Sequence, residues 1–590
     1  MHRRLWLLAG IAAALLVVAT SATATTKVAG SASASRGTPA AMPFARAFAH
    51  TPRTLAGRKA KLTTIWAEEQ DINGFNTVLN CCNQLAGGLI ADYEAQHGAW
   101  NLNSKGQYFL DLASSATANA TGIVYKIRPD AYWYDGGKKV PVTAQDFIYT
   151  WQQQNGSIKT NDVVSTSGYD QMASVTAQGS KTVIVKWKKC PAGGPTADNP
   201  CGFYSDWQAL FGALYPAFAL KGLDFNKIWT NCICDASGQP VSNGPFYLQA
   251  YTKGQGTVLK KNPFYYKPAK LNEVDFKIIS DTNSEVQAMR GGEVDGLMSP
   301  TFGSQLAPLQ TTPGVTFSSI PGYYYEHLDL QEGPKATNPL LRSPWMRQAI
   351  MMGIDRQSII NTIYGSLAKG LKPLNSAIYF STQAAYKPWF QKWNYNQAKA
   401  FALLKQHCTG GPSSPDPNTS AVWTCSGYPA DFQFSWTASN QVRATQGAII
   451  QAQLKAIGIK IDLVPRAANV FFGQYVSQGV YDITDFAWVS PDGDPSGYFA
   501  IWSCGGDQNY LHYCSKKASD LMKQGSTEGN PVKRAALWNA ADQIMAATVP
   551  TIPLYQRPAP LAYKSDLLGV SNNPATVGAQ WNIEDWHWKS

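Results

Sequence analysis

Two carboxylates near the C-terminal end of this 590-residue chain come closest to a reactive arrangement. Asp492 and Asp494 follow a predicted strand with one glycine between them, and paired carboxylates act as acid and base in glycoside hydrolysis. Nothing else supports hydrolysis, because the sequence contains neither G-x-S-x-G nor H-E-x-x-H and its seven histidines lack metal-ligand spacing. We therefore do not expect an enzyme, and composition alone would make this Asp-Gly-Asp-Pro segment a surface turn.

The ten cysteines are the second reactive set, and in an exported chain they predict disulfides. Three pairs lie close in sequence, and each would close a loop worth about 2–4 kcal/mol: Cys190 with Cys201, Cys408 with Cys425, and Cys504 with Cys514. The other four are expected to form two bridges that join Cys81 and Cys82 to Cys232 and Cys234. The Cys-x-Cys spacing could instead bind a metal, but no histidine is near, so we expect no metal and no cofactor.

The N-terminus indicates export. Residues 1–24 combine Arg3 and Arg4, an apolar run over 5–19, and a small-residue cleavage site. The run is shorter than the roughly 20 residues of a membrane span, so we expect cleavage rather than a retained anchor. The first cysteine is Cys81, so the chain has no cysteine for a lipid anchor near the cleavage point.

Residues 25–61 hold seven basic residues and no acidic one, in a background of small and polar residues. This composition predicts a flexible tail, which is either a solvated spacer or a segment attracted to an anionic surface. The tail and signal carry much of the excess charge of +11. Because no long Lys/Arg cluster follows, we do not expect nucleic acid as a partner.

The remaining 62–590 are long enough for two or three domains. Residues 121–151 predict a strand with Ile123 and Tyr125 on one face, a turn at 135–137, and a helix capped by Thr143. Residues 441–463 predict a helix that Gly458 stops, followed by a strand. This alternation favours an α/β fold with a largely parallel sheet.

Several motifs in order along the chain resemble one protein family, the extracytoplasmic solute-binding proteins of peptide ABC importers (bacterial family 5). They are Y-x-I-R with W-x-D-G and T-A-x-D-F over 121–151, N-G-P-F-Y-L at 243–248, K-N-P-x-Y-Y at 261–266, G-E-V-D at 292–295, and M-R-Q-A-I with I-D-R over 346–356. The resemblance implies a two-lobed periplasmic-binding-protein-like fold with a hinge and an extra subdomain. It also implies a monomer outside the cytoplasm, served by membrane permease and ATPase subunits.

The same resemblance places the lobes and the ligand. Lobe I would comprise 62–90, 212–317 and 549–590, with the subdomain 91–211 inserted, and lobe II would be 318–548. The implied ligand-binding residues are Trp488, Ser490, Pro491, Asp492 and Asp494 of the loop 488–495, with Tyr169, Gly74, Phe75 and Asn76.

The loop 488–495 departs from the family at one position. In the peptide binders, the carboxylate that pairs with the ligand's free α-amino group stands where this chain has Pro491, and proline offers neither charge nor N–H. We expect either that Asp492 replaces that carboxylate for a peptide, or that the solute lacks a free amine. A relative that regulates envelope synthesis without transport is a further alternative.

Overall fold

The computed structural model describes residues 62–590 except 197 and 299–301. The expected signal sequence and basic tail lie outside these residues. Within the described part, no helix combines the length and apolar character needed to cross a membrane.

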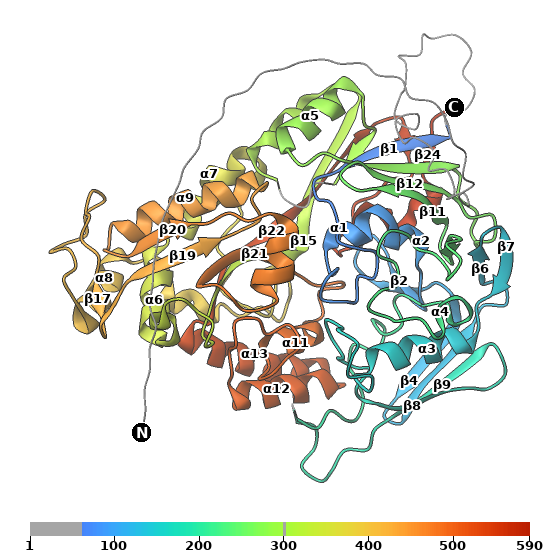
Figure 1. The fold of residues 1–590 in the computed structure, drawn as a ribbon, viewed down its shortest axis with the longest axis horizontal. Coiled ribbons are helices and arrows are strands. Elements are labelled where there is room, and N and C mark those ends of the chain that lie inside the picture. Colours follow the sequence, from blue (N-terminus) through green and yellow to red (C-terminus); the bar gives the residue numbers. More distant parts are fainter. Residues whose placement is uncertain (1–61, 197, 299–301) are drawn as a thin grey trace, which may run out of the picture. The chain divides into compact units, whose positions relative to one another are not determined.

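A ten-stranded sheet runs through this part of the chain, and Figure 1 shows its central strands side by side. Its strands, in spatial order, are β11 (Phe246–Thr252), β12 (Gly256–Lys261), β13 (Glu273–Ile278), β1 (Thr63–Glu68), β14 (Gly296–Leu297), β22 (Thr551–Lys564), β15 (Val315–Leu330), β21 (Ile483–Val489), β19 (Asp431–Ser435) and β20 (Lys460–Leu463).

The sheet is mixed rather than largely parallel, which corrects the expectation from sequence. β1 is parallel to β13 and β14, and β19 is parallel to β20 and β21. The long strands β15 and β22 are antiparallel to each other and to their outer neighbours β21 and β14. At one end of the sheet β12 is antiparallel to both β11 and β13. Two sets of three parallel strands are therefore joined by the antiparallel pair β15 and β22, and no local pattern in the sequence reveals this long-range pairing.

Prolines of β22 lie opposite β15 at several positions, and the pairing shifts register at two places, between Pro321 and Tyr325 and between Glu326 and His327. Pro321 itself lies opposite Pro558. Proline cannot donate to a ladder, so the two strands are weakly bonded there although they pair closely on both sides.

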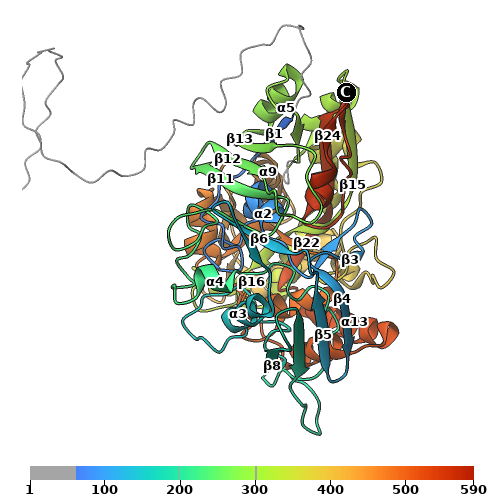
Figure 2. The ribbon, with the colours of Figure 1, turned by 90° about the vertical axis from the view of Figure 1, so that its right-hand side faces the viewer.

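A smaller antiparallel sheet, β4 (Ala113–Asn119), β5 (Gly122–Ile127), β9 (Thr182–Trp187) and β8 (Met172–Ala177), lies beside α3 (Ala144–Gln154), as Figure 2 shows. Ile123 and Tyr125 are buried on one face of β5, which confirms the predicted strand. Thr143 caps α3 in a capping box with Asp146, also as predicted.

Helices cover the sheets, and their buried faces build the cores. The longer ones are α5 (Thr282–Gly291), α6 (Pro344–Gly353), α7 (Arg356–Tyr364), α8 (Gln397–His407), α9 (Gln441–Lys455), α12 (Lys516–Thr527) and α13 (Pro531–Thr548). The predicted helix and strand over 441–463 are confirmed as α9 and β20, with Gly458 in a left-handed conformation between them.

Short elements complete the described chain. The strands are β2 (Trp100–Leu102), β3 (Tyr108–Leu110), β6 (Tyr132–Asp135), β7 (Lys138–Pro141), β10 (Val241–Ser242), β16 (Cys408–Thr409), β17 (Thr424–Cys425), β18 (Tyr428–Pro429), β23 (Leu567–Leu568) and β24 (His587–Trp588). The short helices and helical turns are α1 (Leu85–Gly87), η2 (Gly88–Asp92), α2 (Tyr93–Ala95), α4 (Ala217–Leu220), η3 (Ser304–Thr311), η4 (Pro339–Arg342), η5 (Gly365–Ala368), η6 (Trp389–Trp393), α10 (Ala468–Val470), η7 (Phe471–Val476), η8 (Pro495–Tyr498), α11 (Phe499–Trp502) and η9 (Gly578–Asp585).

Buried apolar side chains form three large clusters in the described residues. One packs around β15, β19 and β21 with α6, α7, α9 and α13. A second packs around β11, β12 and β13 and includes Trp66 and Trp586, whose rings stack. The third fills the space between the four-stranded sheet and α3. Each cluster is large enough to be the core of a separate structural unit.

All ten cysteines are in disulfides, and two pairings differ from those expected. The bridges Cys190–Cys201, Cys408–Cys425 and Cys504–Cys514 close short loops. The other four cysteines do not cross between segments, because Cys81 bonds to Cys82 and Cys232 bonds to Cys234. The two segments are nevertheless close, since Phe75 N donates to Trp229 O at 2.8 Å. Cysteine spacing cannot choose between neighbouring and crossed pairings, and the backbone path decides.

Proteolysis without reductant can test this pairing. Trypsin should release residues 62–105, which contain Cys81 and Cys82, separately from residues 228–253, which contain Cys232 and Cys234. Each peptide should be lighter by two hydrogens than after reduction, as measured by mass spectrometry. Recovery of the two peptides as one linked species would contradict the pairing and restore the crossed bridges.

Candidate functional site

The loop after β21 is held in a fixed shape by its own hydrogen bonds. Ser490 N donates to Tyr323 O at 2.7 Å, and Ser490 Oγ accepts from Gly493 N at 2.9 Å. Gly493 has a φ of +83°, a conformation that favours glycine. Pro491 is exposed on the outside of this turn, whereas Asp492 is turned inward. The inward carboxylate is therefore the one that a molecule inside the site would meet.

Asp492 joins segments that are far apart in sequence. Its Oδ2 accepts from Tyr108 Oη at 2.7 Å, and its Oδ1 accepts from Asp494 N at 2.8 Å. The carboxyl group of Asp206 also bonds to it. Loss of water contact raises the pKa of Asp206 well above its usual range, and the neighbouring carboxylates Asp492 and Asp494 raise it further. Burial and Asp494 raise the pKa of Asp492 as well, but less strongly than that of Asp206, which favours Asp206 as the donor in the hydrogen bond that the two carboxyl groups share.

Asp494 has a structural partner. Its carboxylate pairs with Arg534 of α13 and accepts from Ser496 N at 2.8 Å at the start of η8. The pairing neutralises one negative charge inside the site. Of the carboxylates Asp206, Asp492 and Asp494, only Asp492 combines an inward position with the absence of a described cationic partner.

Trp488 is a wall of the site rather than an open contact surface. Its side chain is 7% exposed, between the rings of His327 and Tyr510, which stack on it at centroid distances of 5.6 Å and 6.1 Å. Its indole N–H is buried and has no hydrogen-bond partner among the described residues. Tyr510 therefore presents the ring surface that continues from Trp488 toward the interior space.

A cavity of about 380 Å³ has Tyr510 in its lining. We call it the polar pocket, and its lining consists of Asn73, Asn80, Cys81, Asp162, Asn469, Gly473, Ser477, Gln478, Asp507 and Tyr510. These residues come from four separate segments, including η7 and the loop between α11 and α12. Apart from Cys81, which the sequence marks only as a disulfide cysteine, none of them stands out in the sequence, because single Asn, Ser or Gln residues in loops carry no pattern until the fold brings them together.

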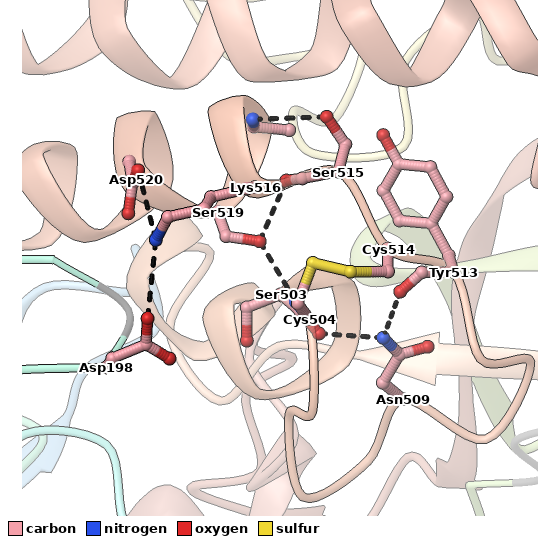
Figure 3. Close-up of a disulfide and its surroundings, with 11 residues drawn as sticks. Asp198, Ser503, Cys504, Asn509, Tyr513, Cys514, Ser515, Lys516, Ser519 and Asp520 are labelled. Carbon is pink, nitrogen blue, oxygen red and sulfur yellow. Dashed lines mark hydrogen bonds and ion pairs between the residues drawn. A yellow bond between two sulfur atoms is a disulfide. The ribbon is translucent and has the colours of Figure 1, made fainter.

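The Cys504–Cys514 disulfide braces the loop that supplies Asp507 and Tyr510 (Figure 3). Cys504 N donates to Ser519 Oγ at 2.9 Å, and Asn509 Nδ2 donates to Ser503 O at 2.7 Å. These contacts hold both ends of the loop against the start of α12. Asp507 and Tyr510 therefore belong to a loop that the disulfide closes, which limits the conformations open to them.

The four remaining residues of the expected ligand set are engaged within the protein. Tyr169 Oη accepts from Phe211 N at 2.8 Å. Asn76 is buried, donating to Phe225 O at 2.9 Å and accepting from Tyr215 Oη at 2.7 Å. Phe75 is fully buried, and Gly74 packs against Cys82 and Trp229. None of the four lines the polar pocket, whereas their neighbours Asn73, Asn80 and Cys81 do.

Comparisons with known proteins place the chain among binding proteins. Residues 107–510 match the family "Bacterial extracellular solute-binding proteins, family 5 Middle". The chain is 26% identical over 471 residues to the oligopeptide-binding protein OppA of Mycobacterium tuberculosis, covering 78% of this chain and 73% of the relative. It is 24% identical over 502 residues to the periplasmic murein peptide-binding protein MppA of Escherichia coli, covering 81% and 86%.

Two solved structures share the fold at low sequence identity. The periplasmic EDTA-binding protein EppA aligns with a TM-score of 0.75 at 21% identity, over 92% of this chain and 100% of that one. The oligopeptide-binding protein AppA of Bacillus subtilis, in complex with a nonapeptide, aligns with a TM-score of 0.74 at 19% identity, over 90% and 100%. At these identities the likeness shows the two-lobed α/β fold alone.

Because the pKa of Asp206 is raised in the folded protein, we expect that replacing this residue changes the thermal stability in a pH-dependent way. Above the ordinary value of 3.8 the unfolded chain loses this proton, whereas the folded protein keeps it, so Asp206 destabilises the fold increasingly as pH rises toward its raised pKa. Asp206→Asn, which can still donate to Asp492, should raise Tm by roughly 2 °C at pH 7 and change it little near pH 3.5. Thermal unfolding followed by circular dichroism measures both.

Asp566→Asn, which changes an exposed carboxylate, is the matched control and should leave Tm nearly unchanged at both pH values. A lower Tm for Asp206→Asn at pH 7, or an equal shift at both pH values, would contradict a proton held between Asp206 and Asp492.

Proposed function

Because the chain belongs to family 5 of the bacterial extracellular solute-binding proteins, we propose that it captures a peptide or peptide-like solute between two lobes and delivers it to the permease and ATPase subunits of an ABC importer. The observation that carries the proposal is the polar pocket beside Trp488, since its lining combines segments from both halves of the fold. Binding rather than catalysis is its task, and we infer that it acts as a monomer outside the cytoplasmic membrane.

We divide the chain into two lobes and an inserted subdomain along the borders that the family resemblance implies. Lobe I comprises 62–90, 212–317 and 549–590, the subdomain is 91–211, and lobe II is 318–548. With these borders β22 belongs to lobe I and β15 crosses from lobe I into lobe II after residue 317, so the pairing of β15 with β22, which includes the opposed Pro321 and Pro558, joins the two lobes. Two strands can bend where the hydrogen bonds between them are missing, so we assign the hinge to the stretch around Pro321 and Pro558.

Several hydrogen bonds join the opposing sides in this arrangement. Tyr510 Oη donates to Asn80 Oδ1 at 3.0 Å across the pocket. Lys523 Nζ, which is buried, donates to Gln171 Oε1 at 2.9 Å. Such contacts support a closed form, and a solute in the pocket would add its own contacts to both sides. Affinity then reflects how strongly the solute favours closure.

Asp492 is the group that would recognise a free α-amino end. Its carboxylate faces inward and lies one residue beyond the exposed Pro491. Asp492 already accepts hydrogen bonds from Tyr108 and Asp206, and a carboxylate that accepts such bonds can also accept them from an ammonium group. If Asp492 does not take this role, the solute lacks a free amine. The family fold would then serve a non-peptide solute or a regulatory task.

Peptides with free and acetylated N-termini distinguish these outcomes. We expect a thermal-shift screen to show stabilisation by free-amine peptides only, and mass spectrometry to find peptides released from protein purified from its native host. Asp492→Asn should weaken free-amine peptides by about tenfold or more, because it removes the carboxylate of a shielded charge pair. Isothermal titration calorimetry measures the change.

Asp566→Asn serves again as the control and should bind like the wild type. Stabilisation that is indifferent to acetylation, or release of a solute that contains no peptide bond, would refute peptide capture through Asp492.

Closure can be tested separately from the identity of the solute. We expect small-angle X-ray scattering to show a smaller radius of gyration after addition of a stabilising peptide, because hinge closure brings the lobes together. An unchanged radius with a bound peptide would contradict a hinge at Pro321 and Pro558.

A further inference from the structure

We infer that the polar pocket selects the charge of the solute: it admits an uncharged or positively charged group rich in hydrogen-bond donors and rejects a carboxylate. The inference deepens the proposed function and rests on it for the position of the solute. It concerns residues that no family motif in this sequence includes.

The lining has negative charge and no positive charge. Asp162 and Asp507 contribute carboxylates, whereas none of the ten described lining residues is Lys, Arg or His. Four amides, those of Asn73, Asn80, Asn469 and Gln478, together with Ser477, supply neutral donors and acceptors. A carboxylate of the solute would be repelled by Asp162 and Asp507, and no cation in the lining would offset the repulsion. Repulsion between like charges is a common way in which proteins exclude unsuitable ligands.

Two lysines lie near the lining without joining it. Lys335 Nζ donates to the backbone oxygen of Gln478 at 2.8 Å, and Lys335 itself is not part of the lining. Lys159 interacts electrostatically with Asp507. Both lysines are exposed, so solvent screens them. Asp162 and Asp507 are exposed as well, so the same screening applies to them, and they differ from the two lysines in belonging to the lining itself.

The polar groups of the lining are fixed before any solute arrives. Asn80 Nδ2 donates to Asp162 Oδ1 at 2.8 Å, and Asn80 Oδ1 accepts from Tyr510 Oη at 3.0 Å. Asp507 Oδ2 accepts from Thr166 N at 3.2 Å and from Thr166 Oγ1 at 3.4 Å. Because these partners orient the carboxylates and the amide, the pocket can discriminate between solutes without rearranging.

The size of the pocket suits one side group of a solute. About 380 Å³ is at the lower end of the range of ligand sites, and Tyr510, whose ring stacks on Trp488, is the aromatic residue of the lining. Gly473 opens the wall, since a Cβ added there would meet nothing within 4 Å. A longer side chain at 473 can therefore enter the space without displacing the protein.

The test uses trialanine and its derivatives in which each position in turn is Gln or Glu, titrated by calorimetry. We expect, for at least one position, about tenfold or tighter binding of the Gln peptide than of the isosteric Glu peptide. The double variant Asp162→Asn/Asp507→Asn should bring the two affinities to within about threefold. Glucose and glucuronate provide a second, non-peptide pair with the same charge difference.

A second variant tests whether this cavity is the place of selection. Gly473→Met should fill the pocket and weaken the Gln peptide relative to trialanine by about tenfold. Gly291→Met is the matched control, because it also adds a side chain into open space, at the end of α5, and it should bind like the wild type. Thermal unfolding confirms that all variants are folded.

The outcomes separate this inference from the proposed function. If trialanine binds but Gln and Glu peptides bind equally in the wild type, or if the double variant keeps the full preference, the charge selection is wrong and peptide capture stands. If no peptide binds but glucose binds in preference to glucuronate, the selection stands and peptide capture falls. Binding of no probe, with no solute released from native protein, would refute the pocket as a solute site.

Discussion

The antiparallel pairing of β15 with β22 is the constraint on which the rest of the described structure depends. These strands join two sets of parallel strands into one sheet and bring 549–590 back beside the first strand of the chain. Just beyond Pro321 and Pro558, a buried charge cluster fixes both strands to α9. Glu326 of β15 pairs with Arg443 at 2.5 Å and with Arg557 of β22 at 3.3 Å.

The electrostatics of this cluster explain why it holds. Burial alone would raise the pKa of Glu326, but Arg443 and Arg557 lower it to about 2, so the carboxylate stays ionised between two cations. Removing one partner of such a group is costly, because it leaves an uncompensated buried charge. The opposed Pro321 and Pro558, at which we propose the hinge, thus lie next to a firmly held anchor.

At the proposed solute site, carboxylates are balanced in more than one way. Asp494 is neutralised by Arg534, and Asp206 is neutralised by keeping its proton, while Asp492 and the pocket residues Asp162 and Asp507 remain as acceptors. The described carboxylates near the Trp488 and Tyr510 rings therefore fall into two groups, those with a partner inside the protein and those that line the polar pocket.

Local patterns predicted much of the fold. The strand face of Ile123 and Tyr125, the capping box of Thr143 and Asp146, and the helix stop at Gly458 are set by neighbours within a few residues, and each was predicted from them. The order of motifs also gave the family, and with it the two-lobed architecture.

Only the tertiary structure decided the rest, because it depends on contacts between segments that are distant in sequence. The mixed sheet, the neighbouring rather than crossed pairing of Cys81, Cys82, Cys232 and Cys234, and the meeting of Asp206 with Asp492 are of this kind. The polar pocket is the clearest case, since its Asn, Ser and Gln residues carry no periodicity or motif. By itself the sequence determined the elements and the class of protein, and the packing of those elements determined which side chains can face a solute.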